Sequence, residues 1–171
     1  MSLASAIRIG ERDHLMRPSP NFSVEGVPAK DAHVPWYRAW NLLQRAVDRV
    51  PAPDPWTGES LLREVQSGNC QLWIAWSYAT RRVEGAMITR LNNNPAVMPN
   101  DRVCEVVLCA GERFKDWGFA MVDLLKAWGA EQGCTYLGGA MRRGWVRWFP
   151  FVEVGKTESG IPIMAMPIRR H

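Results

Sequence analysis

The spacing of apolar residues changes along the chain from a helical to a strand period. Apolar residues three or four positions apart predict a first helix over about residues 33–50. These apolar residues are Trp36, Trp40, Leu43 and Val47. A second, shorter helix is predicted after a proline-rich stretch, with Thr57 or Ser60 as its N-cap and Gly68 near its C-terminal end.

Bulky apolar runs then replace the helical spacing. Cys70–Trp76 and Val83–Leu91 flank a short polar connection and predict a β-hairpin. The segment Arg102–Ala110 is apolar except for Glu105, a pattern typical of a central strand that is covered on both faces. We therefore expect a sheet that is buried beneath helices.

An amphipathic helix of about five turns is predicted after this central strand. Its apolar residues extend from Phe114 to Trp128, and Gly133 terminates it. A short basic and aromatic helix is predicted over Arg142–Phe149. Three further apolar runs predict strands: Cys134–Leu137, Phe151–Gly155 and Ile161–Ile168.

This order of elements predicts one α/β domain, in which a mixed sheet is flanked by helices. A length of 171 residues suits a single domain with its own core. The strand–helix–strand unit at 102–138 is expected to be parallel and right-handed. Residues 1–30 show little periodicity and are interpreted as an N-terminal arm or loop, which leaves residues 31–171 as the domain.

Charge and cysteine usage narrow the classes of partner and site. The net charge of +4 is too small for a nucleic-acid footprint, so nucleic acid is not an expected partner. The cysteines show no C-x-x-C spacing and the histidines are scattered, so no metal site is expected and the thiols are interpreted as core residues. No run approaches the ~20 apolar residues of a membrane span, which predicts a cytoplasmic protein without membrane contact.

The element order resembles the GNAT fold of acetyl-CoA-dependent N-acyltransferases over roughly residues 33–168. Val103–Ala110 is similar to the central strand of the histone-acetyltransferase branch, where an acidic residue stands among apolar ones. The resemblance implies acetyl transfer from acetyl-CoA to a primary amine, with Glu105 as the catalytic base. Alternatively, Glu105 pairs with an arginine such as Arg90 or Arg102, or faces solvent, and has no catalytic role.

The junction between the central strand and its helix carries the cofactor motif of this family, Q/R-x-x-G-x-G/A. Arg113 and Gly118 match the motif, but Asp116 replaces its first glycine. A carboxylate is the wrong charge for a pyrophosphate, which binds backbone N–H groups at a helix N-terminus. The resemblance assigns acetyl-CoA binding to Ala110, Gly111, Arg113, Lys115 and Gly118.

The proton donor of the family is also missing. It is usually a tyrosine on the short last helix, where this chain has Trp148 and Phe149. Neither side chain can protonate a thiolate, and Tyr136 on the preceding strand is an off-pattern substitute. The sequence therefore indicates a degenerate acyltransferase.

A second interpretation is a non-catalytic assembly module. The runs GN-x-Q-L-W-I-A-W and G-W-x-R-x-x-P look similar to GNAT-like proteins encoded among phage morphogenesis genes, which implies a virion or tail component. Tryptophan and arginine are enriched in interface hot spots, so Trp145, Arg147 and Trp148 are the candidate contacts for a protein partner or a second copy. Single-stranded nucleic-acid binding by Arg142–Trp148 is a third interpretation, and the same stretch also fits an amphipathic helix with its aromatic residues inward.

Overall fold

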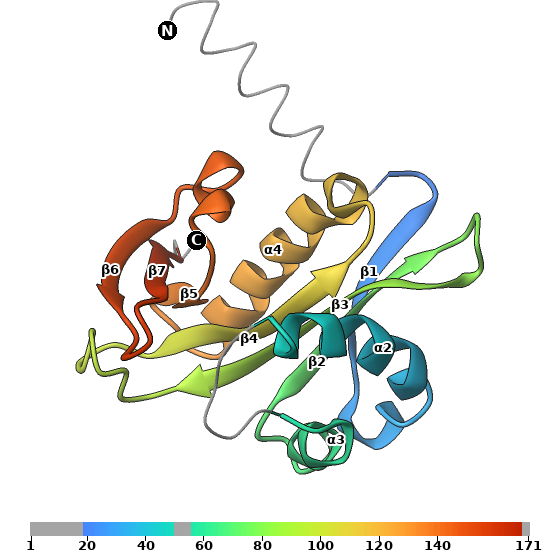
Figure 1. The fold of residues 1–171 in the computed structure, drawn as a ribbon, viewed down its shortest axis with the longest axis horizontal. Helices are drawn as coiled ribbons and strands as arrows, with labels where there is room; N and C mark the ends of the chain where they lie inside the picture. The colour runs from blue at the N-terminus through green and yellow to red at the C-terminus, as the bar shows by residue number, and fades with distance from the viewer. Residues whose placement is uncertain (1–18, 50–55, 169–171) are drawn as a thin grey trace, which may run out of the picture.

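A seven-stranded mixed sheet forms the centre of the structure, a computed structural model that describes residues 19–49 and 56–168 (Figure 1). Its strands are β1 (Phe22–Val27), β2 (Gln71–Ser77), β3 (Arg82–Asn92), β4 (Val103–Gly111), β5 (Tyr136–Ala140), β6 (Val152–Lys156) and β7 (Pro162–Pro167). Their order across the sheet is β1-β2-β3-β4-β5-β7-β6, and only β4 and β5 pair in parallel. The predicted mixed sheet, hairpin and parallel strand pair are confirmed.

Helices cover both faces of this sheet. They are α2 (Trp36–Val47), α3 (Gly58–Gln66) and α4 (Phe114–Glu131), accompanied by the 3-10 turns η1 (Ala29–Asp31) and η2 (Arg143–Arg147). Figure 1 shows α4 on one side of the sheet and α2 and α3 on the other. Two buried clusters result, one that includes Trp117 and Met121 of α4 and one that includes Leu43 and Leu61. Full burial of one such aliphatic side chain stabilises the fold by ~1.5–3 kcal/mol.

Local sequence signals place the ends of α3 as predicted. The Thr57 hydroxyl accepts a hydrogen bond from the Ser60 backbone N–H at 3.1 Å, and the Ser60 hydroxyl accepts one from the Thr57 N–H at 3.0 Å. Gly68 follows the helix with a φ of 85°, a left-handed conformation that favours glycine. Both candidate caps therefore act together in one capping box.

The predicted N-terminal arm is wrong in its last third. Phe22–Val27 forms the edge strand β1, which pairs antiparallel with β2, and Phe22 and Val27 are buried. Phe22, Ser23, Val24 and Glu25 do alternate between apolar and polar residues, but this run is short and is followed at once by Gly26 and Pro28, so it does not stand out as a strand. Residues 1–18 lie outside the described residues.

The β4–β5 pair determines where a site can form. These strands are paired only from Val103 with Tyr136 to Glu105 with Gly138. Beyond this point β4 continues beside β3 as far as Gly111, while β5 pairs with β7. The two parallel strands therefore share a ladder only at their first residues.

Close packing joins the end of β4 to β3. The indole of Trp117 is buried and donates a hydrogen bond to the Glu112 carbonyl oxygen at 2.8 Å. Its ring lies against Gly85, and a Cβ at Gly111 would lie 2.5 Å from the Glu84 carbonyl oxygen. The strand-to-helix junction is thus tightly packed on β3.

Substitution of Gly85 tests this packing. In Gly85→Ala the new methyl group would overlap the ring of Trp117, so we expect the free energy of unfolding to fall by about 1–3 kcal/mol. Gly144→Ala is the matched control, because a Cβ there meets nothing within 4 Å. Thermal melts followed by circular dichroism measure the difference, and equal melting temperatures for the two variants would contradict the close approach.

Candidate functional site

A pocket of about 200 Å³ lies where β4, β5 and β7 meet the loop that follows β3. Its lining residues are Asn92, Pro95, Ala96, Val97, Met98, Val103, Glu105, Gly139, Ala140, Thr157, Ile163 and Met164. Most of these side chains are apolar, and Glu105 is the charged group. The volume is below the ~300–1,000 Å³ of pockets that hold drug-sized ligands, so it suits a small group rather than a whole nucleotide cofactor.

Glu105 lies at the point where β4 and β5 separate, and its carboxylate is already engaged. Arg90 donates hydrogen bonds from Nε to Oε2 at 2.8 Å and from Nη2 to Oε1 at 3.2 Å. Asn92 Nδ2 donates to Oε2 at 3.4 Å. These bonds with Glu105 raise the pKa of the Arg90 guanidinium, which stays charged. The structure therefore shows the predicted arginine pair, with Arg90 and not with Arg102.

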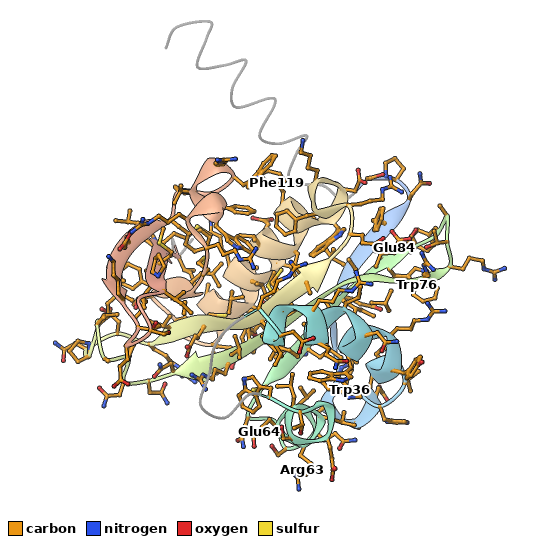
Figure 2. The ribbon with its side chains drawn as sticks, viewed as in Figure 1. Trp36, Arg63, Glu64, Trp76, Glu84 and Phe119 are labelled. Carbon is orange, nitrogen blue, oxygen red and sulfur yellow. The ribbon has the colours of Figure 1, made fainter. Side chains whose placement is uncertain are left out.

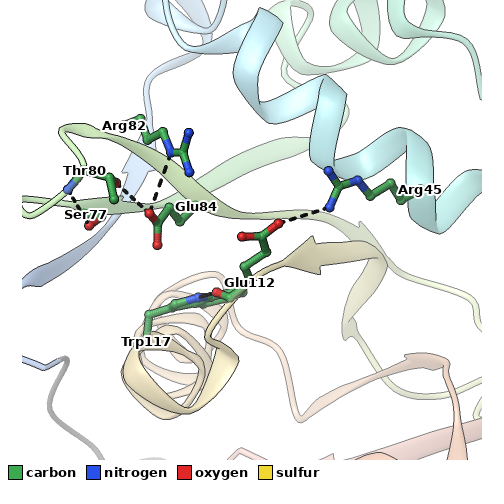
Figure 3. Close-up of polar contacts among 7 residues, drawn as sticks. All are labelled: Arg45, Ser77, Thr80, Arg82, Glu84, Glu112 and Trp117. Carbon is green, nitrogen blue, oxygen red and sulfur yellow. Dashed lines mark hydrogen bonds and ion pairs between the residues drawn. The ribbon is translucent and has the colours of Figure 1, made fainter.

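The junction between β4 and α4 contains the residues assigned to acetyl-CoA. Arg113 has a left-handed backbone, and its Nε donates to Asp116 Oδ2 at 2.8 Å. The Asp116 N–H donates to the Arg113 carbonyl oxygen, and the Glu112 N–H donates to the Glu84 carbonyl oxygen, each at 2.9 Å. Figure 3 shows the Glu112 side chain paired with Arg45 of α2 at 3.4 Å. The two carboxylates of the junction, Glu112 and Asp116, are therefore each paired with an arginine.

The ring of Phe114 covers Gly118. A Cβ at Gly118 would overlap this ring, so the space against the glycine is occupied. Phe114 also packs edge-on against Trp117, with ring centroids 5.0 Å apart, and against Trp145 at 5.3 Å. These rings belong to an aromatic cluster that joins α4 to η2 and the segment after it. The aromatic cluster comprises Phe114, Trp117, Phe119, Trp145, Trp148, Phe149 and Phe151.

The predicted interface residues separate into core and surface. Trp145 is half-buried and lies 5.6 Å from Phe149 and 6.1 Å from Phe151 between ring centroids, so it holds the aromatic cluster together. Arg147 and Trp148 are exposed. Phe119 of α4, labelled in Figure 2, packs against Trp148, with ring centroids 5.8 Å apart. Trp145 therefore packs against the buried core and stays partly exposed, and the exposed candidates are Arg147 and Trp148.

No tyrosine stands near Glu105 in the pocket lining. Tyr136 is half-buried at the start of β5, opposite Val103, and does not line the pocket. Phe149 is buried in the aromatic cluster, where a family tyrosine would be expected. Among the lining residues, Thr157 carries a hydroxyl group. This hydroxyl shares a hydrogen bond with the hydroxyl of Ser159 at 3.0 Å.

Glu84 of β3 lies beside the junction (Figure 3), where its carbonyl oxygen accepts a hydrogen bond from the Glu112 N–H, and it was not among the site residues predicted from the sequence. Its side chain is 6% exposed, and the Thr80 hydroxyl donates to Oε1 at 2.6 Å. Arg82 Nε lies 3.7 Å from the same oxygen, whereas Oε2 has no hydrogen-bond partner among the described residues. A single glutamate next to a predicted turn gives no signal of burial, because burial here follows from tertiary packing.

Metal and thiol chemistry find no support in the part of the chain that the structure describes. No three His, Cys, Asp or Glu side chains there are grouped so that they could hold a metal ion. Burial raises the pKa of the Cys70 thiol to about 11 and that of Cys104 to about 12. Both thiols are therefore protonated at neutral pH, which makes them poor nucleophiles.

Thiol labelling tests this burial. Ellman's reagent at about pH 8 should react far more slowly with Cys70 and Cys104 in the native protein than with a free thiol, since burial keeps both protonated and covered. The same protein in concentrated guanidinium is the control and should release the full thiol count at once. Rapid native labelling at these two positions, located by peptide mass spectrometry, would contradict the buried core.

Comparison with known proteins identifies the fold. No protein-family model and no curated protein sequence matches the chain significantly. Solved structures do match. FeeM, an N-acyl amino acid synthase from uncultured soil microbes, superposes with a TM-score of 0.58 at 12% identity over 88% of this chain and 91% of its own. The polyamine N-acetyltransferase of Drosophila melanogaster gives 0.59 at 10% identity, over 85% and 99%.

A third structure is the PaiA N-acetyltransferase of Thermoplasma acidophilum in complex with coenzyme A, with a TM-score of 0.54 at 14% identity over 85% of this chain and 98% of that one. Similarities at this level of identity establish the fold alone. They confirm the mixed sheet flanked by helices as that of the GNAT acyltransferases. Within the described residues, no helix combines the length and apolar character that crossing a membrane requires.

Proposed function

We propose that this GNAT-fold chain is a non-catalytic protein-binding module rather than an acetyl-CoA-dependent N-acyltransferase. One observation carries the proposal: the ring of Phe114 occupies the space against Gly118. In the active motif this glycine leaves the backbone open to the pyrophosphate. A side chain in that space stands where the cofactor would have to approach.

The hydrogen-bonding state of the junction supports the same conclusion. A phosphate-binding nest needs free N–H groups and positive charge at the helix N-terminus. Here the N–H groups of Glu112 and Asp116 donate to carbonyl oxygens within the protein. Arg113 is paired with Asp116. The positive charge of the arginine that matches the motif is therefore compensated by the aspartate that replaces the first glycine of the motif.

The aromatic cluster makes this closure difficult to reverse. Each aromatic pair in an edge-on or tilted geometry contributes roughly 0.5–1.5 kcal/mol beyond its buried area. Phe114 takes part in three such pairs, with Trp117, Trp145 and Phe149. If a cofactor displaced the ring, the protein would lose all three contacts. The aromatic cluster therefore favours the closed state.

Titration with acetyl-CoA tests the proposal. We expect no heat of binding to the wild-type protein at millimolar acetyl-CoA in isothermal calorimetry, because the Phe114 ring occupies the space against Gly118 and Asp116 compensates the charge of Arg113. The double variant Phe114→Ala with Asp116→Gly restores both space and charge and should gain measurable binding, whereas Asp116→Gly alone keeps the ring and should not. Micromolar affinity of the wild-type chain would overturn the proposal.

A second candidate function is acetylation of a small amine, since a glutamate lines a pocket where the parallel strands separate. One protein with this fold, the polyamine N-acetyltransferase, is named for its action on amines. The bidentate Arg90 pair argues against it, because both carboxylate oxygens of Glu105 already accept hydrogen bonds.

An assay of free CoA release distinguishes the two functions. With acetyl-CoA and a panel of primary amines, the wild-type protein should show no turnover above the uncatalysed rate. Turnover that falls by about 100-fold or more in Glu105→Gln would establish the enzyme instead. Arg63→Gln at an exposed position of α3 is the control, because it removes one charge at a residue that does not line the pocket.

The resemblance to GNAT-like proteins of phage morphogenesis supports an assembly role for the module. In that role the partner is another protein, and the location is the cytoplasm in which assembly takes place or the assembled particle. The exposed residues of η2 are where such a partner would bind, since Trp145 packs against Phe149 and Phe151. Acetyl-CoA is then neither cofactor nor substrate.

A further inference from the structure

We infer that η2 and the first turn of α4 bind an acidic segment of a partner protein that carries one apolar side chain. This inference rests on the proposed protein-binding function and names the chemistry of the partner. The surface consists of Lys115, Arg142, Val146, Arg147 and Trp148, and is called the basic tryptophan surface here. All of its members are exposed.

Uncompensated positive charge is the first argument. Arg143 is paired with Glu153 at 3.3 Å, and Arg113 with Asp116 at 2.8 Å. Lys115, Arg142 and Arg147 form no ion pair with any described residue. Lys115 lies over the Trp148 ring, Arg147 directly precedes Trp148, and Arg142 stands at the start of the same short helix. Three such cations attract a segment of opposite charge and accelerate its encounter with the surface.

Exposed apolar area on a fixed support is the second argument. The side chains of Val146 and Trp148 are 47% and 42% exposed. Trp148 packs edge-on against Phe119, with ring centroids 5.8 Å apart and an interplanar angle of 76°. A tryptophan that is already immobilised loses little side-chain entropy when a partner covers it, which is why such residues are frequent in hot spots.

The environment of the Trp148 ring favours a peptide over single-stranded nucleic acid. A base binds by stacking on an open ring face, and successive bases need successive rings. The Lys115 ammonium lies over the Trp148 ring, 5.1 Å from its centroid, and takes a face that a base would need. Of the neighbouring aromatic residues, Phe149 is buried and Trp145 is half-buried, so neither presents a second open ring. A carboxylate binds a cationic side chain such as Lys115 or Arg147 and needs no free ring face.

Fluorescence anisotropy with synthetic probes tests the inference. The probes are a labelled oligoglutamate peptide with one central leucine, the same peptide without leucine, and a labelled oligothymidylate. The wild-type protein should bind the leucine peptide most tightly. The variant Arg142→Glu with Arg147→Glu should weaken it by about tenfold or more, and Trp148→Ala should remove the preference for the leucine peptide.

The control variant is Arg38→Glu with Arg63→Glu, which reverses the same charge at exposed positions of α2 and α3 on the other side of the sheet. It should bind the leucine peptide as the wild type does, and thermal melts should show that every variant folds. No binding of the peptide, equal loss in the control variant, or tighter binding of oligothymidylate that the η2 variants abolish would each overturn the inference. Acetyl-CoA titration is a separate measurement, so the proposed lack of cofactor binding stands or fails independently.

Discussion

The parallel pairing of β4 with β5 extends over only three residues of each strand, and the rest of the candidate site depends on where it stops. After Glu105 and Gly138 the strands share no ladder, and side chains have to fill the space beside them because protein interiors are close-packed. On the α4 face the aromatic cluster does so, in one buried core with Val106 and Met141. At Glu105 the filling is incomplete and leaves a pocket.

Most of the fold follows from signals that are local in the sequence. The period of α4, the hairpin β2–β3 and the capping box of Thr57 each depend on residues a few positions apart, and all were predictable. β1 was not, because its six residues become a strand through pairing with β2, from which they are separated by α2 and α3. The alternation of apolar and polar residues from Phe22 to Glu25 is too short to distinguish a strand from a loop.

For the site, the sequence could predict which types of residue are present but not which partners they contact. Glu105 stood out as the charged residue of an apolar strand, but Arg90 and Arg102 were equal candidates as partners until the β3–β4 register placed Arg90 opposite it. The mismatch at Asp116 was visible in the motif, whereas the position of the Phe114 ring was not. Side-chain packing between segments distant in sequence decides such details, as it does for the buried Glu84.

The edge position of β1 has a consequence for how the chain folds. The β2–β3 hairpin forms across a short turn. Pairing of β1 with β2 requires closure of the long connection through α2 and α3, which is slower. During this delay one border of the sheet presents a row of unsatisfied amide and carbonyl groups. Another nascent copy could add a strand there, so crowded synthesis would favour exchange of this N-terminal segment between molecules.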